Sequence, residues 1–380
     1  MTLSRVLLIA EIGINHNGDM DLAETMIHAA RDAGADAVKF QNYVADEFLS
    51  DHTLTYTYLS QGREVTESQL AMFKRYELSD ADLVRLKQCC DRAGVLFFST
   101  PMGKGGVDAL IRIGTAYLKN GSDCLGHLPL IRHMARTGLP TILSTGMANE
   151  AEIAEAVAAF RGAGGSDLVL LACTSAYPTP SDAVHLRRIP ELARKFNCAA
   201  GFSDHTAGWE AAVAAVCVGA CMIEKHFTTD RQLPGPDHWF SSDPVEFREL
   251  VLRVREVETM LGRPELQPTA LERRAREEYR VTCTAARDLP AGHILAEADI
   301  GFHRPAGGLP PSQLENLLGR TLVQDLKRGD GFSWACVAPS EEPHESLGFP
   351  GRARDSVAAE TITARKESTL GLQGGIGRSA

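Results

Sequence analysis

The stretch VLLIAEIGINHNGDMDLAETMIHAARDAGADAVKFQ (residues 6–41) joins two short apolar runs through an amphipathic segment. This alternation repeats as far as residue 262, and the eight apolar runs are VLLIAEIG (6–13), ADAVKFQ (35–41), VLFFST (95–100), TAYLKNG (115–121), PTILSTG (140–146), DLVLLACT (167–174), CAAGFSD (198–204) and ACMIEKHF (220–227). Near-continuous apolar strands separated by helices are typical of a parallel sheet covered by helices. Eight such units suit a closed barrel, which takes about 250 residues. The sequence therefore predicts an α/β fold with a (β/α)8 TIM barrel, and an open doubly wound sheet is the alternative.

The rest of the chain differs from the barrel in composition. A polar segment with the charged stretch LERRAREE (271–278) precedes a segment rich in Gly and Pro, which predicts a compact β-rich module. The final segment has few large apolar side chains and cannot bury enough surface to fold alone. We expect a barrel at 1–262, a linker at 263–280, the β-rich module at 281–340 and a disordered tail at 341–380.

The overall composition excludes several classes of protein. The 380 residues are 44% apolar and 23% charged, as in globular proteins. The net charge of −10 argues against a nucleic acid or an anionic membrane as partner. The longest apolar stretch, residues 211–223, is shorter than the roughly 20 residues of a spanning helix, and the N-terminus has no cleavage-site pattern. The nine cysteines form no CxxC pair, so we expect reduced thiols and a cytoplasmic location.

Polar residues stand at the end of every predicted strand. In a barrel of this kind the loops after the strands open onto one shared mouth, where reactive residues gather. Parallel strands are otherwise buried on both faces, so eight polar strand ends in register indicate an active site. These residues are Glu11, Lys39, Ser99 and Thr100, Lys119, Ser144 and Thr145, Thr174 and Ser175, Asp204 and His205, and Glu224, Lys225 and His226.

Lys39 and Lys119 are embedded in apolar strand sequence. A buried lysine is costly unless it faces an anion, so we expect both to hold a phosphate or a carboxylate. The alternative is an ion pair inside the barrel with Glu11, Asp36 or Glu224. Neutral donors around the same anion are available from four hydroxyl side chains: Thr100, Ser144, Ser175 and Ser203.

His205 and His226 end consecutive strands, which lie about 4.8 Å apart in a sheet, so both imidazoles can reach one ion. Two imidazoles with open positions suit a catalytic divalent metal ion. The alternative is that one of them only forms hydrogen bonds. Asp237 is a candidate for binding sugar hydroxyls or transferring a proton, with turn formation as the alternative. For His16, local backbone capping is at least as consistent with the sequence as catalysis is.

Several long motifs match one known family: AEIGINHNGD (10–19), AGADAVKFQ (33–41), FFSTPM (97–102), LPLI (128–131), ILSTGM (142–147), CTSAYPTP (173–180), GFSDHTAG (201–208), IEKHFT (223–228) and LPGPDH (233–238). Over residues 6–337 the chain resembles the sialic acid synthases, also called nonulosonate synthases. The stretch DLPAGHILAEADIGFHRP (288–305) resembles the antifreeze-like (SAF, β-clip) module of these enzymes. The resemblance implies a barrel followed by that module, and a domain-swapped homodimer in which the module covers the partner's barrel mouth.

The resemblance also implies roles for individual residues. It places the metal ligands at His205 and His226. It places the contacts to phosphoenolpyruvate at Lys39, Thr100, Lys119, Ser144 and Ser203, and those to the acceptor sugar at Glu11, Tyr177 and Asp237, with Arg304 reaching into the partner's site. Two positions depart from the family pattern: Ser175 stands where Asn is usual, and Cys124, preceded by Asp123, stands where an acidic residue is common.

The implied reaction condenses phosphoenolpyruvate with the open-chain aldehyde of an N-acyl amino sugar. The product is a nine-carbon, sialic-acid-like 2-keto sugar acid, and Glu11 is the expected general acid or base. The acceptor is N-acetylmannosamine, a 2,4-diacetamido hexose or a phosphorylated form, and the ion is manganese, cobalt or magnesium. Two alternatives remain, namely another 3-deoxy-ulosonate synthase that uses a phosphorylated sugar, and a non-catalytic sugar-binding relative.

Overall fold

The computed structural model describes residues 5–305 and 307–339. The chain forms two compact units that divide between Pro264 and Glu265. The expected tail at 341–380 lies outside the described residues.

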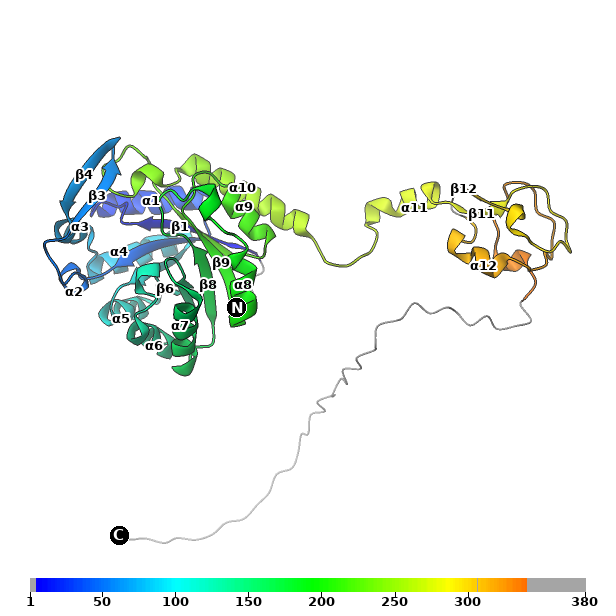
Figure 1. The fold of residues 1–380 in the computed structure, drawn as a ribbon. Coiled ribbons are helices and arrows are strands. Elements are labelled where there is room, and N and C mark those ends of the chain that lie inside the picture. Colours follow the sequence, from blue (N-terminus) through cyan, green and yellow to red (C-terminus); the bar gives the residue numbers. More distant parts are fainter. Residues whose placement is uncertain (1–4, 306, 340–380) are drawn as a thin grey trace, which may run out of the picture. The chain divides into compact units, whose positions relative to one another are not determined.

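The first unit is a closed barrel of parallel strands (Figure 1). Around the barrel the strands follow the order β1-β10-β9-β8-β7-β6-β5-β2, and each expected apolar run contains one of them. The predicted barrel is confirmed, and the open sheet is excluded because β1 and β2, the two ends of this order, also pair with each other. The strands are β1 (Leu7–Gly13), β2 (Ala37–Asn42), β5 (Leu96–Pro101), β6 (Leu118–Asn120), β7 (Thr141–Ser144), β8 (Leu168–Cys173), β9 (Ala199–Asp204) and β10 (Met222–His226).

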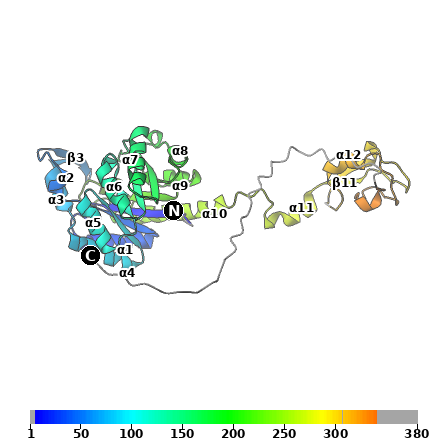
Figure 2. The same cartoon turned by 90° about the horizontal axis from the view of Figure 1, so that it is seen from below.

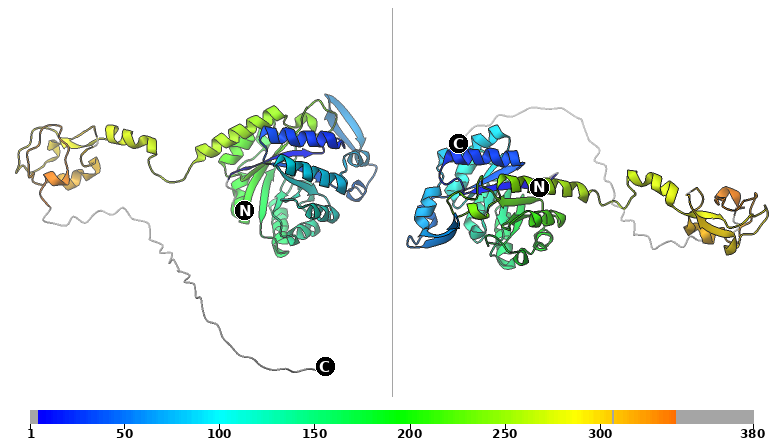
Figure 3. Two further views of the ribbon diagram at one scale, coloured as in Figure 1. Left: turned by 180° about the vertical axis from the view of Figure 1, so that it is seen from behind. Right: turned by 90° about the horizontal axis from the view of Figure 1, so that it is seen from above.

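Helices surround the strands, as Figure 3 shows from behind and from above. Their apolar faces pack on the outside of the barrel, and residues such as Met26, Leu86 and Phe160 are fully buried there. No helix of the described residues is long and apolar enough to cross a membrane. The helices of this layer are α1 (Met20–Ala33), α4 (Asp80–Ala93), α5 (Lys104–Ile113), α6 (Leu128–Arg136), α7 (Glu150–Gly162), α8 (Arg188–Phe196), α9 (Glu210–Cys217) and α10 (Pro244–Leu261).

The inside of the barrel is filled at one end only. A layer of apolar side chains closes the end where the strands begin, as is usual for this fold. The carboxyl ends of the strands are free of this layer, so the interior opens there. The layer consists of Leu7, Ile9, Ala37, Phe98, Ile142, Val169, Leu171 and Met222.

An insertion between β2 and α4 was not predicted. It consists of α2 (Ala45–Phe48), an antiparallel hairpin of β3 (Thr55–Ser60) and β4 (Arg63–Ser68), and α3 (Gln69–Tyr76). The turn of the hairpin has positive φ at Gln61 (51°) and Gly62 (74°), which favours a tight two-residue connection. Alternation of polar and apolar residues in TYTYLS beside Gln-Gly was the signal for this hairpin.

The second unit is small and β-rich, as predicted (Figure 2). It contains α11 (Arg273–Tyr279), an antiparallel pair of β11 (Thr282–Ala285) and β12 (Ile300–His303), and α12 (Leu314–Leu317). Its core is built around buried residues such as Leu289, Leu317 and Phe332. The buried Asp299 carboxylate accepts hydrogen bonds from Arg287 and from the Ala296 backbone, and it contacts the His293 ring.

Candidate active site

A cavity of about 940 Å³ lies at the carboxyl ends of the barrel strands. All the barrel residues that the sequence analysis assigned to the metal ion or the substrates line it, although they are spread over more than two hundred positions of the chain. They meet because parallel strands in register bring their carboxyl ends to one rim. The candidates in the lining are Glu11, Lys39, Thr100, Lys119, Ser144, Ser175, Tyr177, Ser203, His205, His226 and Asp237.

Strand alternation decides which polar residues at the strand ends face the cavity. Glu224 and His226 on β10 are two residues apart and both line it. Lys225, between them, does not line it, and its Nζ instead lies 2.8 Å from both Asp204 Oδ2 and the Thr206 carbonyl oxygen. The polar strand ends therefore divide into a group that lines the cavity and a group that ties the strands together.

Two buried lysines lie among the charged residues that line the cavity. Lys39 Nζ lies 2.8 Å from Glu11 Oε2 and donates to Thr100 Oγ1 at 2.9 Å. Lys119 Nζ donates to Ser144 Oγ at 2.7 Å. The ion pair that the sequence left open as the alternative is thus present, and the hydroxyl groups beside the lysines are in hydrogen-bond contact with them.

Glu224 lies between the two lysines. Its Oε1 is 3.5 Å from Lys119 Nζ and 3.9 Å from Lys39 Nζ, and it accepts a hydrogen bond from Ser203 Oγ at 3.2 Å. Burial alone would raise the pKa of Glu224, but the charges of Lys119 and Lys39 outweigh it, so the pKa lies below its ordinary value. Two lysines and two glutamates thus form a charge-balanced cluster with Glu11 at its edge.

The pKa values of the other three groups follow their surroundings. Burial raises the pKa of Glu11, and the Lys39 charge opposes this rise only in part. Burial lowers the pKa of Lys119, and Glu224 restores only part of it. Burial acts in the same direction on Lys39, but the charges of Glu11 and Glu224 outweigh it and raise its pKa. An arriving anion would therefore stabilise the charged form of Lys119 more than that of Lys39.

The two histidines lie side by side, with ring centroids 5.5 Å apart. His205 Nδ1 is 2.8 Å from the Thr174 carbonyl oxygen and donates to it, which leaves Nε2 as the basic nitrogen. His226 Nδ1 is buried without a hydrogen bond to any described residue and lies 3.9 Å from Asp237 Oδ2. Burial holds the pKa of His226 well below its ordinary value, so its ring is neutral.

A metal ion at this place would have two imidazole ligands from the chain. Within residues 5–305 and 307–339, no group of three or more His, Cys, Asp and Glu side chains is close enough to bind a metal ion by itself. The unpartnered nitrogen of His226 and the basic nitrogen of His205 nevertheless fit an ion that keeps open positions for substrate oxygens and water.

Only one of the two residues that depart from the family pattern, Ser175, lines the cavity. Asp123 lines the cavity, whereas Cys124 is buried and does not. Ser175 also lines the cavity, and its Oγ lies 2.6 Å from where a Cβ on Gly146 would be placed. Ser175 is therefore the departure that changes the lining of the cavity.

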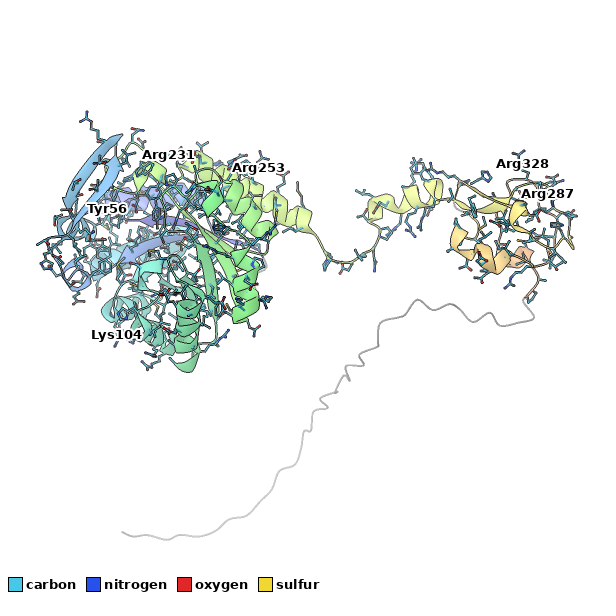
Figure 4. All side chains as sticks on the ribbon, viewed as in Figure 1. Tyr56, Lys104, Arg231, Arg253, Arg287 and Arg328 are labelled. Carbon is cyan, nitrogen blue, oxygen red and sulfur yellow. The ribbon has the colours of Figure 1, made fainter. Side chains whose placement is uncertain are left out.

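Sequence reasoning missed an aromatic wall at the mouth of the cavity. Tyr56 and Tyr58 come from the unpredicted hairpin, and their rings are 5.7 Å apart; Figure 4 marks Tyr56. Trp239 and Phe240 follow the LPGPDH motif and also line the cavity. Gln41 was missed too, and its Nε2 donates to Glu11 Oε1 at 3.1 Å.

Arg304 lies in the second unit, where it is exposed and its guanidinium stacks 5.5 Å from the Tyr279 ring centre. His16 accepts a hydrogen bond from the Gly18 backbone at 3.1 Å, as the capping interpretation predicted.

Comparison with known proteins places the chain in one family. The family model NeuB matches residues 26–265, and the SAF domain model matches residues 282–338. The chain is 38% identical to N,N'-diacetyllegionaminic acid synthase of Legionella pneumophila, over 86% of this chain and 93% of that protein. It is 35% identical to a pseudaminic acid synthase of Campylobacter jejuni, over 87% of this chain and 96% of that protein.

A solved structure agrees with this result. The crystal structure of the N-acetylneuraminic acid synthetase of Leptospira borgpetersenii, in complex with citrate, is 34% identical, with a TM-score of 0.65. The match covers 72% of this chain and 94% of that chain. The chain therefore belongs to the NeuB family, the sialic acid synthase family that its motifs resemble, and carries a SAF domain after the barrel.

Proposed function

We propose that the protein condenses phosphoenolpyruvate with the open-chain aldehyde of an N-acyl amino sugar, giving a nine-carbon 2-keto sugar acid and phosphate. One observation carries this proposal: two buried lysines and two neighbouring imidazoles line a single cavity at the mouth of the barrel. The names of the relatives support the same class of reaction.

Lys39 and Lys119 would hold the phosphate and the carboxylate of phosphoenolpyruvate. Each lysine now makes an ion pair with a glutamate, and an arriving anion would share that lysine with the glutamate. Hydroxyl donors of Thr100, Ser144 and Ser203 stand beside the same charges. Holding C3 near the aldehyde carbon in this way can lower the barrier by as much as about 7–11 kcal/mol.

His205 and His226 would hold a divalent ion, manganese, cobalt or magnesium. Such an ion supplies Lewis acidity at the aldehyde oxygen of the acceptor. The hydrogen bond from His205 to the Thr174 carbonyl orients that ring, and Tyr177 packs against it with ring centroids 4.2 Å apart.

Glu11 is the group that we assign to proton transfer near the sugar. Its carboxyl is buried and its pKa is raised by that burial, so it can carry a proton closer to neutral pH than an exposed glutamate. After C3 of phosphoenolpyruvate has bonded to the aldehyde carbon, water adds at C2 and phosphate leaves with the C2–O bond electrons.

We place the acceptor sugar against Tyr177, Asp237 and Ser175. Apart from Lys39 and Lys119, no lysine or arginine of the described residues lines the cavity. A phosphorylated acceptor needs a second basic cluster, so this lining favours an unphosphorylated sugar. In a domain-swapped homodimer, Arg304 of the partner subunit would cover the mouth and bind the acyl group.

The test is phosphate release from phosphoenolpyruvate with a panel of aldehyde sugars, with and without a chelator, followed by mass spectrometry of the product. We expect release that requires N-acetylmannosamine or a 2,4-diacetamido hexose and stops when the chelator is added. The control variant Lys225→Gln changes a buried lysine that does not line the cavity. It shows how far loss of a buried lysine by itself lowers phosphate release. Release that depends on a phosphorylated sugar alone would support the octulosonate or heptulosonate type of synthase instead.

A further inference from the structure

A second cavity, of about 1070 Å³, lies in the first unit beside the amino-terminal ends of α8 and α9. It shares no lining residue with the candidate active site. The loop from β8 to α8 supplies His185 and Arg187, α8 begins with Arg188, and the loop from β9 to α9 supplies Thr206 and Ala207. None of the functions proposed above uses this cavity.

The lining of this cavity contains two arginines and two glutamates, and both glutamates have hydrogen-bond partners other than these arginines. Arg187 and Arg188 are exposed, and neither guanidinium forms an ion pair or a hydrogen bond with any residue in the described part of the chain. Of the two glutamates in the lining, Glu191 is bound by Arg194 at 2.7 Å. Glu210 accepts a hydrogen bond from the backbone nitrogen next to it in the chain, at 3.0 Å. Two guanidinium groups on consecutive residues are thus left with donors for a carboxylate or a phosphate.

The cavity also has an apolar side. Val184 is buried, Leu186 is half-buried, and the Ala207 and Ala211 side chains complete the wall. A small inorganic anion would leave this wall and most of the volume in water. A larger organic anion with a flat apolar part fills both, because ligand sites combine apolar walls with a few polar groups.

We propose that this second cavity binds a phosphorylated organic metabolite, such as a nucleoside monophosphate, and that its occupancy controls the order of the active-site loops. The phosphate pairs with Arg187 and Arg188, and the apolar part lies against Val184, Leu186 and Ala211.

The same two loops build both cavities. The β8–α8 loop lines the active site with Ser175 and Tyr177 before it reaches the second cavity, and the β9–α9 loop passes from His205 directly to Thr206. Hydrogen bonds tie the loops to each other, since the Thr179 backbone donates to the His205 carbonyl at 2.8 Å.

A further bond joins the two ends of the β8–α8 loop. Thr174 Oγ1 donates to the Ala183 carbonyl at 2.9 Å, next to the lining of the second cavity. A ligand that holds Arg187, Arg188 and the segment after His205 therefore restrains the residues that present Tyr177 and His205 to the active site.

The experiment is isothermal titration calorimetry of the full chain with adenosine 5′-monophosphate and, separately, with inorganic phosphate. We expect the nucleotide to bind more tightly than phosphate. The variant Arg187→Gln/Arg188→Gln should weaken nucleotide binding at least about tenfold, because it removes two charge-assisted donors. The control Arg132→Gln/Arg136→Gln removes the same charge from two exposed arginines of α6, outside both cavities, and should bind as the wild type does.

Amide hydrogen exchange with bound nucleotide provides a readout that needs no turnover, so its result stands apart from the proposed reaction. We expect slower exchange over residues 174–188 and 205–211 in the wild type and no such change in the Arg187→Gln/Arg188→Gln variant. Absence of nucleotide binding, or equal weakening in both double variants, would overturn the site. Binding that protects 184–188 but leaves 174–183 and 205–207 unchanged would overturn the control of the loops.

Discussion

The balance of charge in the candidate active site can be tested by a double-mutant cycle on Lys119 and Glu224. Lys119→Met leaves the Glu224 carboxylate with a more distant partner, and Glu224→Gln leaves the buried Lys119 ammonium without its partner. Removing one member of a buried pair typically costs about 3–5 kcal/mol of stability. The double variant removes both charges, so it should cost about as much as one single variant.

The size of the coupling follows from the distance. At 3.5 Å between Lys119 Nζ and Glu224 Oε1, two unit charges interact by about 5 kcal/mol with an effective dielectric constant of about 20. Because both side chains are almost fully buried, solvent screens this pair very little. We therefore expect a coupling free energy of about 3–5 kcal/mol in the cycle.

The assay is urea-induced unfolding followed by far-ultraviolet circular dichroism, in which the barrel helices dominate the signal. A control cycle combines Lys119→Met with Glu11→Gln, because Glu11 forms its ion pair with Lys39 and none with Lys119. Its coupling should be clearly smaller. A Lys119–Glu224 coupling below about 1 kcal/mol, or one equal to the control, would refute the idea that Glu224 is the main counter-charge of Lys119.

Three further predictions concern the rest of the chain. Hydrogen bonding lowers the pKa of Asp299 from 3.8 to about 2 in the folded module, so this carboxylate stabilises the module above about pH 4, and that stability is lost as the pH falls through 2. Asp299→Asn should therefore lower hydrogen-exchange protection of residues 282–303 at pH 7, and the difference from the wild type should vanish near pH 2. Gly201→Ala should destabilise the barrel by about 1–3 kcal/mol, because the new Cβ would lie 2.7 Å from the Met222 carbonyl oxygen. Gly105→Ala, inside α5 and with no atom within 4 Å of its new Cβ, should not destabilise it, and urea unfolding compares the two variants. Iodoacetamide should label Cys217 first, because it is the exposed cysteine among the described residues, and peptide mass spectrometry identifies the labelled site.

The barrel and the charged floor of the site were predictable because their signals are local. An apolar strand that ends in a lysine or a histidine is visible in a few residues, and the closed barrel then requires all such ends to meet. The same logic correctly placed Lys39, Lys119, His205 and His226 in one cavity.

Other features needed the folded chain. In the sequence, Asp204 and Lys225 are polar strand ends like their neighbours. The alternation of side chains along the strands turns both away from the cavity, and they pair with each other outside it. Tyr56 and Tyr58 lie on an insertion whose pattern indicates a hairpin, while its position over the cavity depends on contacts far away in the sequence.

Residue order along the chain was enough to predict the barrel, its β-rich companion and the lysines and histidines of the cavity, because periodicity and strand-end chemistry act over short distances. Distances between charges, the direction of each pKa shift and the second cavity arose only in three dimensions. They depend on which residues from separate strands and loops become neighbours, and on how much water their packing removes from around each charge.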